Sequence, residues 1–345
     1  MRAFEVRKPG EYGLIDARVP EITDEEVLVK VGYAAICHSD IDMLTGNRKH
    51  LISYPNIAGH EFAGTIVKTG KKVTAFHEGD RVAIECMIMC RQCAPCDKGM
   101  TACENYSELG FMRSGGFAEF CAVPARNCHK LETMKMEQAA LTEPLANGVA
   151  ITEAAEIRPG DRVVVIGPGP IGLFGLICAK LYQPRQTIMV GTRYNRLKYA
   201  EGIADALVNI REEDAFARIM ELTGGKGADV VLMCATTPSA CELALRVAGA
   251  GARIIIEGCP GDEPVPVNFN LFTQKTITIK GSAGANARQF RKVIDLVESG
   301  YLDPMPFVTH ILPLERIEEG FDILKKRNQD AVKILIDPGK KEETK

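Results

Sequence analysis

Four cysteines close together in the sequence restrict the folding of this chain more than any other feature. They are Cys90, Cys93, Cys96 and Cys103, in the run CRQCAPCDKGMTAC, and we call these four residues the cysteine ladder. Tetrahedral Zn²⁺ takes four thiolates at about 2.3 Å, and a C-x2-C turn brings two sulfurs to one point. Buried cysteines or disulfides are the alternative, but neither explains the repeated x2 spacing, and disulfides are rare in cytosolic proteins. Since four thiolates fill every position, the pattern predicts a structural zinc site.

Length and composition restrict the class of protein. The chain has 345 residues, which at about 150 residues per domain indicates roughly two domains. Its net charge of −3 argues against a nucleic-acid partner, which would require a basic face. The N-terminal sequence lacks the apolar core of a signal peptide, and no apolar run is long enough to cross a bilayer. We therefore expect a cytoplasmic protein without a membrane partner.

The pattern of apolar residues divides the chain into two kinds of segment. Up to about residue 145, short alternating runs such as 26–31 are separated by glycine turns, which is typical of strands. From about residue 160, short buried strands alternate with helices, which favours an α/β fold with a doubly wound parallel sheet. The last 60 or so residues are too few for a separate core. We expect one domain formed by residues 1–146 and 286–345, and a second formed by residues 147–285.

A glycine pattern follows directly after the apolar run RVVVI. In G-x-G-x-x-G, the first glycine allows a tight turn, the second lets a pyrophosphate approach the backbone, and the third lets helix and strand pack closely. The following helix offers free N–H groups to the phosphates. A glycine-rich turn is the alternative, but strand, glycines, helix and second strand follow in the order of a Rossmann dinucleotide site. The predicted cofactor-binding residues are Gly167, Gly169, Pro170, Ile171 and Gly172.

The end of the second strand of this domain has no acidic residue. An NAD site uses such a residue, about 20 positions after the glycines, to bind the ribose 2′-OH. Here the run is Gly191-Thr192-Arg193, with Arg196 close behind. Gly191 avoids a carboxylate that would repel a 2′-phosphate, Thr192 supplies a hydroxyl, and Arg193 a bidentate phosphate donor. The pattern favours NADP over NAD; the alternative is that Arg193 is a solvated residue at a helix start.

Cys37 in the run CHSD and His60 in the run GHE lie outside the cysteine ladder. A catalytic zinc needs about three protein ligands and one open position, and thiolate and imidazole are suitable ligands. Taken alone, each of these two residues is more often a core residue. Cys86 lies close enough to the ladder to be a rival ligand there, although it lacks an x2 partner.

The run GHEFAGTIVKTGKKV fits the pattern G-H-E-x2-G-x5-G-x2-V. This pattern resembles the signature of zinc-containing alcohol dehydrogenases of the medium-chain dehydrogenase/reductase superfamily. CHSD, the cysteine ladder and VIGPGPIG follow in that family's order, so the resemblance covers essentially the whole chain; only the last ladder spacing, x6, is one residue shorter than expected. The resemblance implies a GroES-like, β-rich catalytic domain, a Rossmann domain, and two zinc ions per chain, one catalytic and one structural.

The same resemblance implies a set of catalytic zinc ligands. Cys37 and His60 are two of them. The third position falls on Glu143, in the run LTEPL, which is similar to the E-P-L run of sorbitol (polyol) dehydrogenases. Glu143 is expected to bind zinc directly or through water, and Glu61 to enter the zinc shell when the water leaves.

Catalytic roles also follow from the resemblance. Zinc lowers the pKa of a bound alcohol, and hydride then passes to C4 of the nicotinamide. Ser39 matches the family's relay hydroxyl. Asp40 is expected to hold the far nitrogen of His60, unless it only caps a turn. The relay histidine of some members is replaced by Asp42, which leaves the exit of the proton open, and His50 is another candidate base.

The substrate is expected to be polar. The chain has no Trp and only 6% aromatic residues, whereas pockets for bulky apolar alcohols are often lined by aromatic side chains. The E-P-L run favours a polyol, sugar alcohol or sugar. The loop Arg48-Lys49-His50 would suit a phosphorylated one; the alternative is that it is only a solvated loop. Alternatives are an amino-alcohol oxidiser similar to L-threonine 3-dehydrogenase and, in another class, a non-catalytic nucleotide-binding relative. Family members form homodimers or homotetramers, and Thr276–Ser282 is a plausible edge strand for such contacts.

Overall fold

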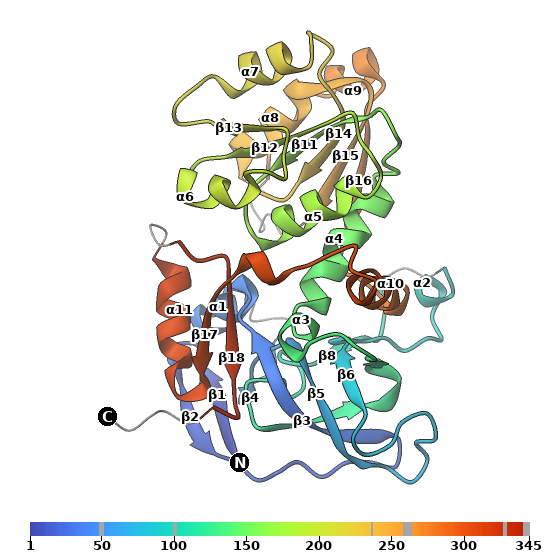
Figure 1. Cartoon of the computed structure of the whole chain (residues 1–345), viewed down its shortest axis with the longest axis vertical. Coiled ribbons are helices and arrows are strands. Elements are labelled where there is room, and N and C mark those ends of the chain that lie inside the picture. The colour runs from blue at the N-terminus through green and yellow to red at the C-terminus, as the bar shows by residue number, and fades with distance from the viewer. Residues whose placement is uncertain (48–51, 99–101, 236, 258–263, 327–329, 341–345) are drawn as a thin grey trace. The chain divides into compact units, whose positions relative to one another are not determined.

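The structure is a computed structural model that describes residues 1–47, 52–98, 102–235, 237–257, 264–326 and 330–340 (Figure 1). The chain divides into two compact units. The first unit consists of Met1–Glu143 and Ala285–Lys345, and the second consists of Pro144–Gly284. The second unit therefore interrupts the first in the sequence. Among the described residues, no helix is both long enough and apolar enough to span a membrane.

The first unit is built mainly from strands, in three sheets. The largest has the order β10-β6-β5-β3-β18-β17, and β9 also pairs with β3. β18 comes from the C-terminal segment and pairs antiparallel with β3, with Leu335 opposite Ala35, so the two segments share one sheet (Figure 1). The strands are β1 (Arg2–Lys8), β2 (Glu11–Asp16), β3 (Glu26–Ala35), β4 (Asn56–Ile57), β5 (Glu61–Thr69), β6 (Arg81–Ile84), β7 (Met87–Ile88), β8 (Ser107–Glu108), β9 (Phe120–Pro124), β10 (Cys128–Lys130), β17 (Val308–Pro313) and β18 (Lys333–Asp337).

Aromatic side chains from both segments form the centre of this unit's core. Phe321 lies 5.4 Å from Phe4 and 6.1 Å from Phe117 between ring centroids, and all three are fully buried. Burial of one such side chain contributes about 2 kcal/mol. The helices around this core are α1 (His38–Thr45), α2 (Ala94–Asp97), α3 (Met136–Ala139), α10 (Ala287–Glu298) and α11 (Ile317–Lys325), with 3₁₀ turns η2 (Ala125–Asn127), η4 (Met305–Phe307) and η5 (Leu314–Arg316).

The second unit is a six-stranded parallel sheet with the order β13-β12-β11-β14-β15-β16. The order reverses between β11 and β14, which is a topological switch point. Figure 1 shows α5 and α8 on opposite faces of the sheet, so the predicted doubly wound α/β fold is confirmed. The elements are β11 (Arg162–Ile166), α5 (Pro170–Lys180), β12 (Gln186–Gly191), α6 (Tyr194–Leu197), η3 (Lys198–Ala200), β13 (Ala206–Asn209), α7 (Ala215–Leu222), β14 (Ala228–Met233), α8 (Pro238–Val247), β15 (Ala248–Glu257), α9 (Asn270–Lys275) and β16 (Thr278–Ser282); α4 (Thr142–Ala154) precedes them.

Candidate metal centres and cofactor loop

Three potential metal ligands of the first unit lie together: Cys37, His60 and Glu61. One ligand atom from each lies within 4.8 Å of the other two. Cys37 is the N-cap residue of α1, and Glu61 is the first residue of β5. Glu61 is opposite Ala35 at the end of β3, so the pairing of β3 with β5 brings the runs CHSD and GHE to one place. Thiolate, imidazole and carboxylate are all ligands that zinc accepts.

The backbone before His60 allows only glycine. Gly59 has φ +94, and a Cβ atom on it would lie 2.7 Å from the ring of Phe117. This conformation is accessible to glycine without steric cost. On its other side the His60 ring packs against Phe111, with 4.9 Å between the ring centroids. The backbone before His60 and the ring of Phe111 thus both restrict where the imidazole lies.

Asp40 is buried beside the His60 imidazole. One carboxylate oxygen lies 3.3 Å from His60 Nδ1, and the other accepts the backbone N–H of Cys37 at 2.8 Å. Burial alone would lower the pKa of His60, but the Asp40 carboxylate outweighs it and raises that pKa well above its ordinary value. Because Nδ1 faces Asp40, Nε2 is the ring nitrogen left on the side of Glu61, 3.9 Å from Glu61 Oε1.

Glu61 has a partner that the sequence analysis did not identify. Lys333 Nζ donates hydrogen bonds to both Glu61 carboxylate oxygens, at 2.6 Å to Oε1, and to the Ile36 carbonyl at 3.3 Å. Both side chains are 1% exposed. Burial would lower the pKa of Lys333, but the charge of Glu61 raises it. A lysine inside the apolar run AVKILID was the available signal, because a fully buried lysine requires a partner.

Glu143 lies outside the group of three ligands. It belongs to the first turn of α4, and its charge contributes to raising the pKa of Lys333 and of the Cys86 thiol. The hydroxyl of the preceding Thr142 is buried and has no hydrogen-bond partner within the described residues.

Two residues considered for proton transfer lie on α1. Ser39 is partly exposed in the first turn of this helix, and Asp42 accepts a hydrogen bond from Asn47 at 3.2 Å.

The four ladder cysteines form a second group, with sulfurs within 4.8 Å of one another. The Sγ atoms of Cys90 and Cys96 are 3.9 Å apart, and those of Cys93 and Cys103 are 4.0 Å apart. A tetrahedron with zinc–sulfur distances of about 2.3 Å has edges of about 3.8 Å, so these thiols fit zinc. The backbone N–H of Cys90 donates to Cys103 Sγ at 3.3 Å and lowers the pKa of that thiol. Cys86 is not in this group.

The glycine loop of the second unit is closely packed at the switch point. A Cβ atom on Gly172 would lie 1.9 Å from the carbonyl oxygen of Gly167, so the third glycine is sterically required. Gly169 is the N-cap residue of α5, with Pro170 and Ile171 in its first turn, where N–H groups are free for phosphates. The neighbouring strand β12 ends at Gly191 and is followed by Thr192 and Arg193, the N-cap residue of α6, which contains Arg196.

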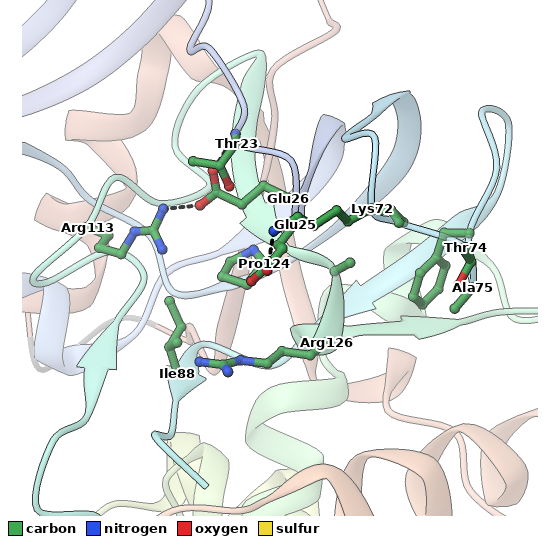
Figure 2. Close-up of a pocket in the computed structure, with 13 residues that line it drawn as sticks. Thr23, Glu25, Glu26, Lys72, Thr74, Ala75, Ile88, Arg113, Pro124 and Arg126 are labelled. Carbon is green, nitrogen blue, oxygen red and sulfur yellow. Dashed lines mark hydrogen bonds and ion pairs between the residues drawn. The ribbon is translucent and has the colours of Figure 1, made fainter. Parts of the chain in front are cut away.

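The loop Arg48-Lys49-His50 falls outside the described residues. Figure 2 shows a surface pocket of about 490 Å³ on the first unit, which none of the predicted site residues lines. Four of its five charged side chains are paired, Arg113 with Glu26 and Lys72 with Glu25 at 3.3 Å, and the fifth is Arg126. We therefore assign this pocket no part in the predicted chemistry.

Comparison with known proteins gives matches over both units. A family model described as the alcohol dehydrogenase GroES-like domain matches residues 23–133, and one described as zinc-binding dehydrogenase matches residues 170–299. L-threonine 3-dehydrogenase of Bacillus licheniformis is 34% identical over 330 residues, covering 93% of this chain and 95% of that protein. Sorbitol dehydrogenase of Bacillus subtilis is 29% identical over 346 residues, covering 99% and 98%. A putative zinc-binding dehydrogenase from Sinorhizobium meliloti 1021, solved bound to NADP, matches with a TM-score of 0.92 and 26% identity over 98% of this chain and 99% of that one.

Proposed function

The chain belongs to the zinc-containing alcohol dehydrogenase family of the medium-chain dehydrogenase/reductase superfamily, and we propose that it oxidises a secondary alcohol of a polyol or sugar alcohol with NADP. Membership confirms the predicted family, the GroES-like and Rossmann folds, and an oxidoreductase that uses zinc and NAD(P). The finer statements rest on one observation above all. Cys37, His60 and Glu61, far apart in the sequence, present a ligand atom each within 4.8 Å.

The donor atoms of both groups fit zinc. We assign the catalytic ion to Cys37 and His60, with Glu61 or Glu143 completing the shell, and the structural ion to the four ladder cysteines. The chemistry that bound zinc supplies is to lower the pKa of an alcohol so that an alkoxide can form. Asp40 fixes the tautomer and orientation of His60. Ser39 is placed in the first turn of α1, directly after Cys37, and is assigned to move the alcohol proton away.

The nucleotide is assigned to residues 147–285, and the metals to residues 1–146 and 286–345. Gly167, Gly169, Pro170, Ile171 and Gly172 would bind the pyrophosphate at the start of α5. Thr192, Arg193 and Arg196 follow the end of β12, where a 2′-phosphate would lie. Solved relatives of the same fold hold NADP in one case and NADH in another, so the choice of NADP over NAD rests on the residues that follow β12. The assembly is assigned as a homodimer or homotetramer, with β16 at an edge of its sheet.

Oxidation of L-threonine or another amino alcohol is the second candidate. It is favoured by the 34% identity to an L-threonine 3-dehydrogenase, which exceeds the 29% identity to a sorbitol dehydrogenase. Both reactions oxidise a secondary alcohol and use the same metal group. They differ in the group on the neighbouring carbon. That group is a hydroxyl in a polyol and an ammonium in threonine.

The test is formation of reduced nicotinamide by the zinc-loaded protein. Polyols, sugar phosphates, simple secondary alcohols and L-threonine are each supplied with NAD⁺ and with NADP⁺. Turnover of a polyol, faster with NADP⁺, is the expected result, and the variant Cys37→Ala should lose turnover while still binding the cofactor. Faster turnover with L-threonine would favour the second candidate. Failure of every substrate would contradict the proposal.

A further inference from the structure

Pro168, the second residue of the glycine loop, packs against the end of the neighbouring strand β12. A Cβ atom on Gly191, the last residue of that strand, would lie 2.6 Å from Pro168 Cγ and 2.8 Å from Pro168 Cδ. Its next contact would be Leu197 Cδ2 at 3.0 Å. Separations below 3.0 Å are steric clashes for a Cβ atom, so the proline ring leaves room only for glycine at position 191.

The loop that carries Pro168 is fixed on two sides. The N–H of Gly167 donates to the carbonyl of Val190 at 2.9 Å, which ties the loop to β12 one residue before Gly191. On the side of α5, the carbonyl oxygen of Gly167 lies 1.9 Å from the place of a Cβ atom on Gly172. The loop therefore has little room to carry the proline ring away from Gly191.

Gly191 is also held on the far side of β12. It is buried, and it lies opposite Asn209 of β13. Its carbonyl oxygen accepts the N–H of Ile210 at 2.9 Å. Leu197 reaches the position only with the end of a side chain that can change rotamer. The ring of Pro168 is thus the obstacle that a side chain at position 191 cannot displace.

Position 191 is where dinucleotide sites of this kind select their cofactor. It ends the second strand of the unit, about 20 residues after the glycine pattern, where an acidic side chain binds the ribose 2′-OH of NAD. A carboxylate there would also repel the 2′-phosphate of NADP, because like charges disfavour a complex. Since only glycine fits, the chain has no place for that carboxylate.

We propose that Pro168 determines cofactor specificity by excluding an acidic side chain at position 191. The ring acts through the space that it takes from Gly191, without a bond to the ribose. Thr192 and Arg193, which follow Gly191, then supply a hydroxyl and a guanidinium for a 2′-phosphate. This inference rests on the proposed function and deepens it, because it assigns the preference for NADP to packing as well as to charge.

The experiment is a double-mutant cycle on the zinc-loaded protein, with Pro168→Ala and Gly191→Asp. Alanine lacks Cγ and Cδ, which are the two atoms that clash. Thermal midpoints report on the packing. Gly191→Asp alone should lower the midpoint by about 5 °C, because an overpacked side chain strains its surroundings. The double variant Pro168→Ala/Gly191→Asp should recover most of this loss, because the two positions are in contact.

Cofactor binding is the second measurement in the same cycle, with dissociation constants for NADPH and NADH obtained by calorimetry. In the double variant, the constant for NADPH should rise about 10- to 100-fold and that for NADH should fall, so that the preference reverses. Gly191→Asp alone should bind both cofactors weakly, because the clash distorts the loop. Pro168→Ala alone should still prefer NADPH, because Gly191 and Arg193 are unchanged.

Two control variants separate packing from charge. Gly191→Ala adds a Cβ atom without a charge, so it should lower the midpoint in the wild-type background and not in the Pro168→Ala background. Thr192→Asp adds the same charge at the next residue, which is exposed. It should weaken NADPH binding without lowering the midpoint.

A Gly191→Asp protein as stable as the wild type would overturn the inference, because the ring would then give way. A double variant as unstable as Gly191→Asp, or one that still prefers NADPH, would also overturn it, since Pro168 would not be the obstacle. These results leave the proposed use of NADP standing. A wild type that binds NADH more tightly than NADPH overturns that proposed choice and this inference together.

Discussion

Lys333 and Glu61 form a buried ion pair, and each of the two side chains is only 1% exposed. The pair links the first residue of β18 to the first residue of β5, which are 272 residues apart in the sequence. Glu61 also belongs to the candidate catalytic ligand group. The cation that neutralises a potential zinc ligand is thus supplied by the C-terminal segment of the chain.

Lys333→Met should destabilise the protein. It leaves the Glu61 carboxylate buried without its cation, which costs about 3 kcal/mol or more. The double variant Glu61→Met/Lys333→Met should recover most of this loss, because a buried apolar pair replaces a buried ion pair of similar volume. Urea denaturation at saturating zinc measures both effects. A single variant as stable as the wild type would show that the pair is exposed or already broken in solution.

Zinc stoichiometry tests the two metal groups separately. Cys93→Ser should release the structural ion and lower the melting temperature, because a structural zinc contributes to folding directly. Cys37→Ser should release only the catalytic ion. Cys86→Ser is the control and should keep both ions, since Cys86 lies outside both ligand groups. Elemental analysis of the purified variants gives the result, and loss of an ion in Cys86→Ser would make it a ligand after all.

Glu298→Gln should weaken the attachment of α10 to the loop before α3. One carboxylate oxygen of Glu298 accepts the N–H groups of Glu132, Thr133 and Met134 at 2.8, 2.9 and 3.0 Å. Partial burial alone would raise the pKa of Glu298, but the hydrogen bonds from these three N–H groups outweigh it and lower that pKa. A lowered pKa in the folded state gives stability that is present above the unfolded value of about 4.3 and lost as the pH falls through the folded value.

The difference in stability between wild type and Glu298→Gln should therefore be about 1–3 kcal/mol at neutral pH and should shrink below about pH 4. Urea midpoints measured across this range follow the change. Asp303→Asn is a useful comparison, because Asp303 accepts a hydrogen bond from Gln138 in the same region without the three backbone donors. A difference that stays constant down to pH 3 would be inconsistent with the bound carboxylate.

Arg193→Gln should reduce the use of NADP selectively. If the guanidinium binds the 2′-phosphate, kcat/KM for NADP⁺ should fall about 10- to 100-fold while that for NAD⁺ changes little. Arg196→Gln, one turn further along α6, should have a smaller effect. Steady-state rates with both cofactors test this. Parallel losses with the two cofactors would assign Arg193 a structural role instead.

Local patterns predicted much of the fold and of the site. The double x2 spacing identified four cysteines that do converge, and the glycine pattern identified a turn that lies at the switch point of the sheet. These features depend on residues close in sequence. Gly191 was interpreted through charge, but Pro168 would lie 2.6 Å from a Cβ atom there, so glycine also has a packing reason.

Contacts between distant strands were not predictable in the same way. The pairing of Lys333 with Glu61 depends on the register of β18 with β3 and of β3 with β5. The contact of Cys86 with Glu108 depends on the pairing of β7 with β8. Sequence spacing carries no information on such registers. The place of Glu143 relative to the metal stays a prediction for the same reason.

The position of β18 in the chain has a consequence for biosynthesis. A ribosome releases β3, α1 and β5, with Cys37, His60 and Glu61, long before it reaches Lys333. Until then the nascent first unit contains a ligand carboxylate without its cation and a sheet without two of its strands. The whole parallel-sheet unit must be translated in between. We therefore expect a metal at Cys37, His60 and Glu61 to be bound late in maturation, whereas the cysteine ladder is complete after its own short segment has emerged.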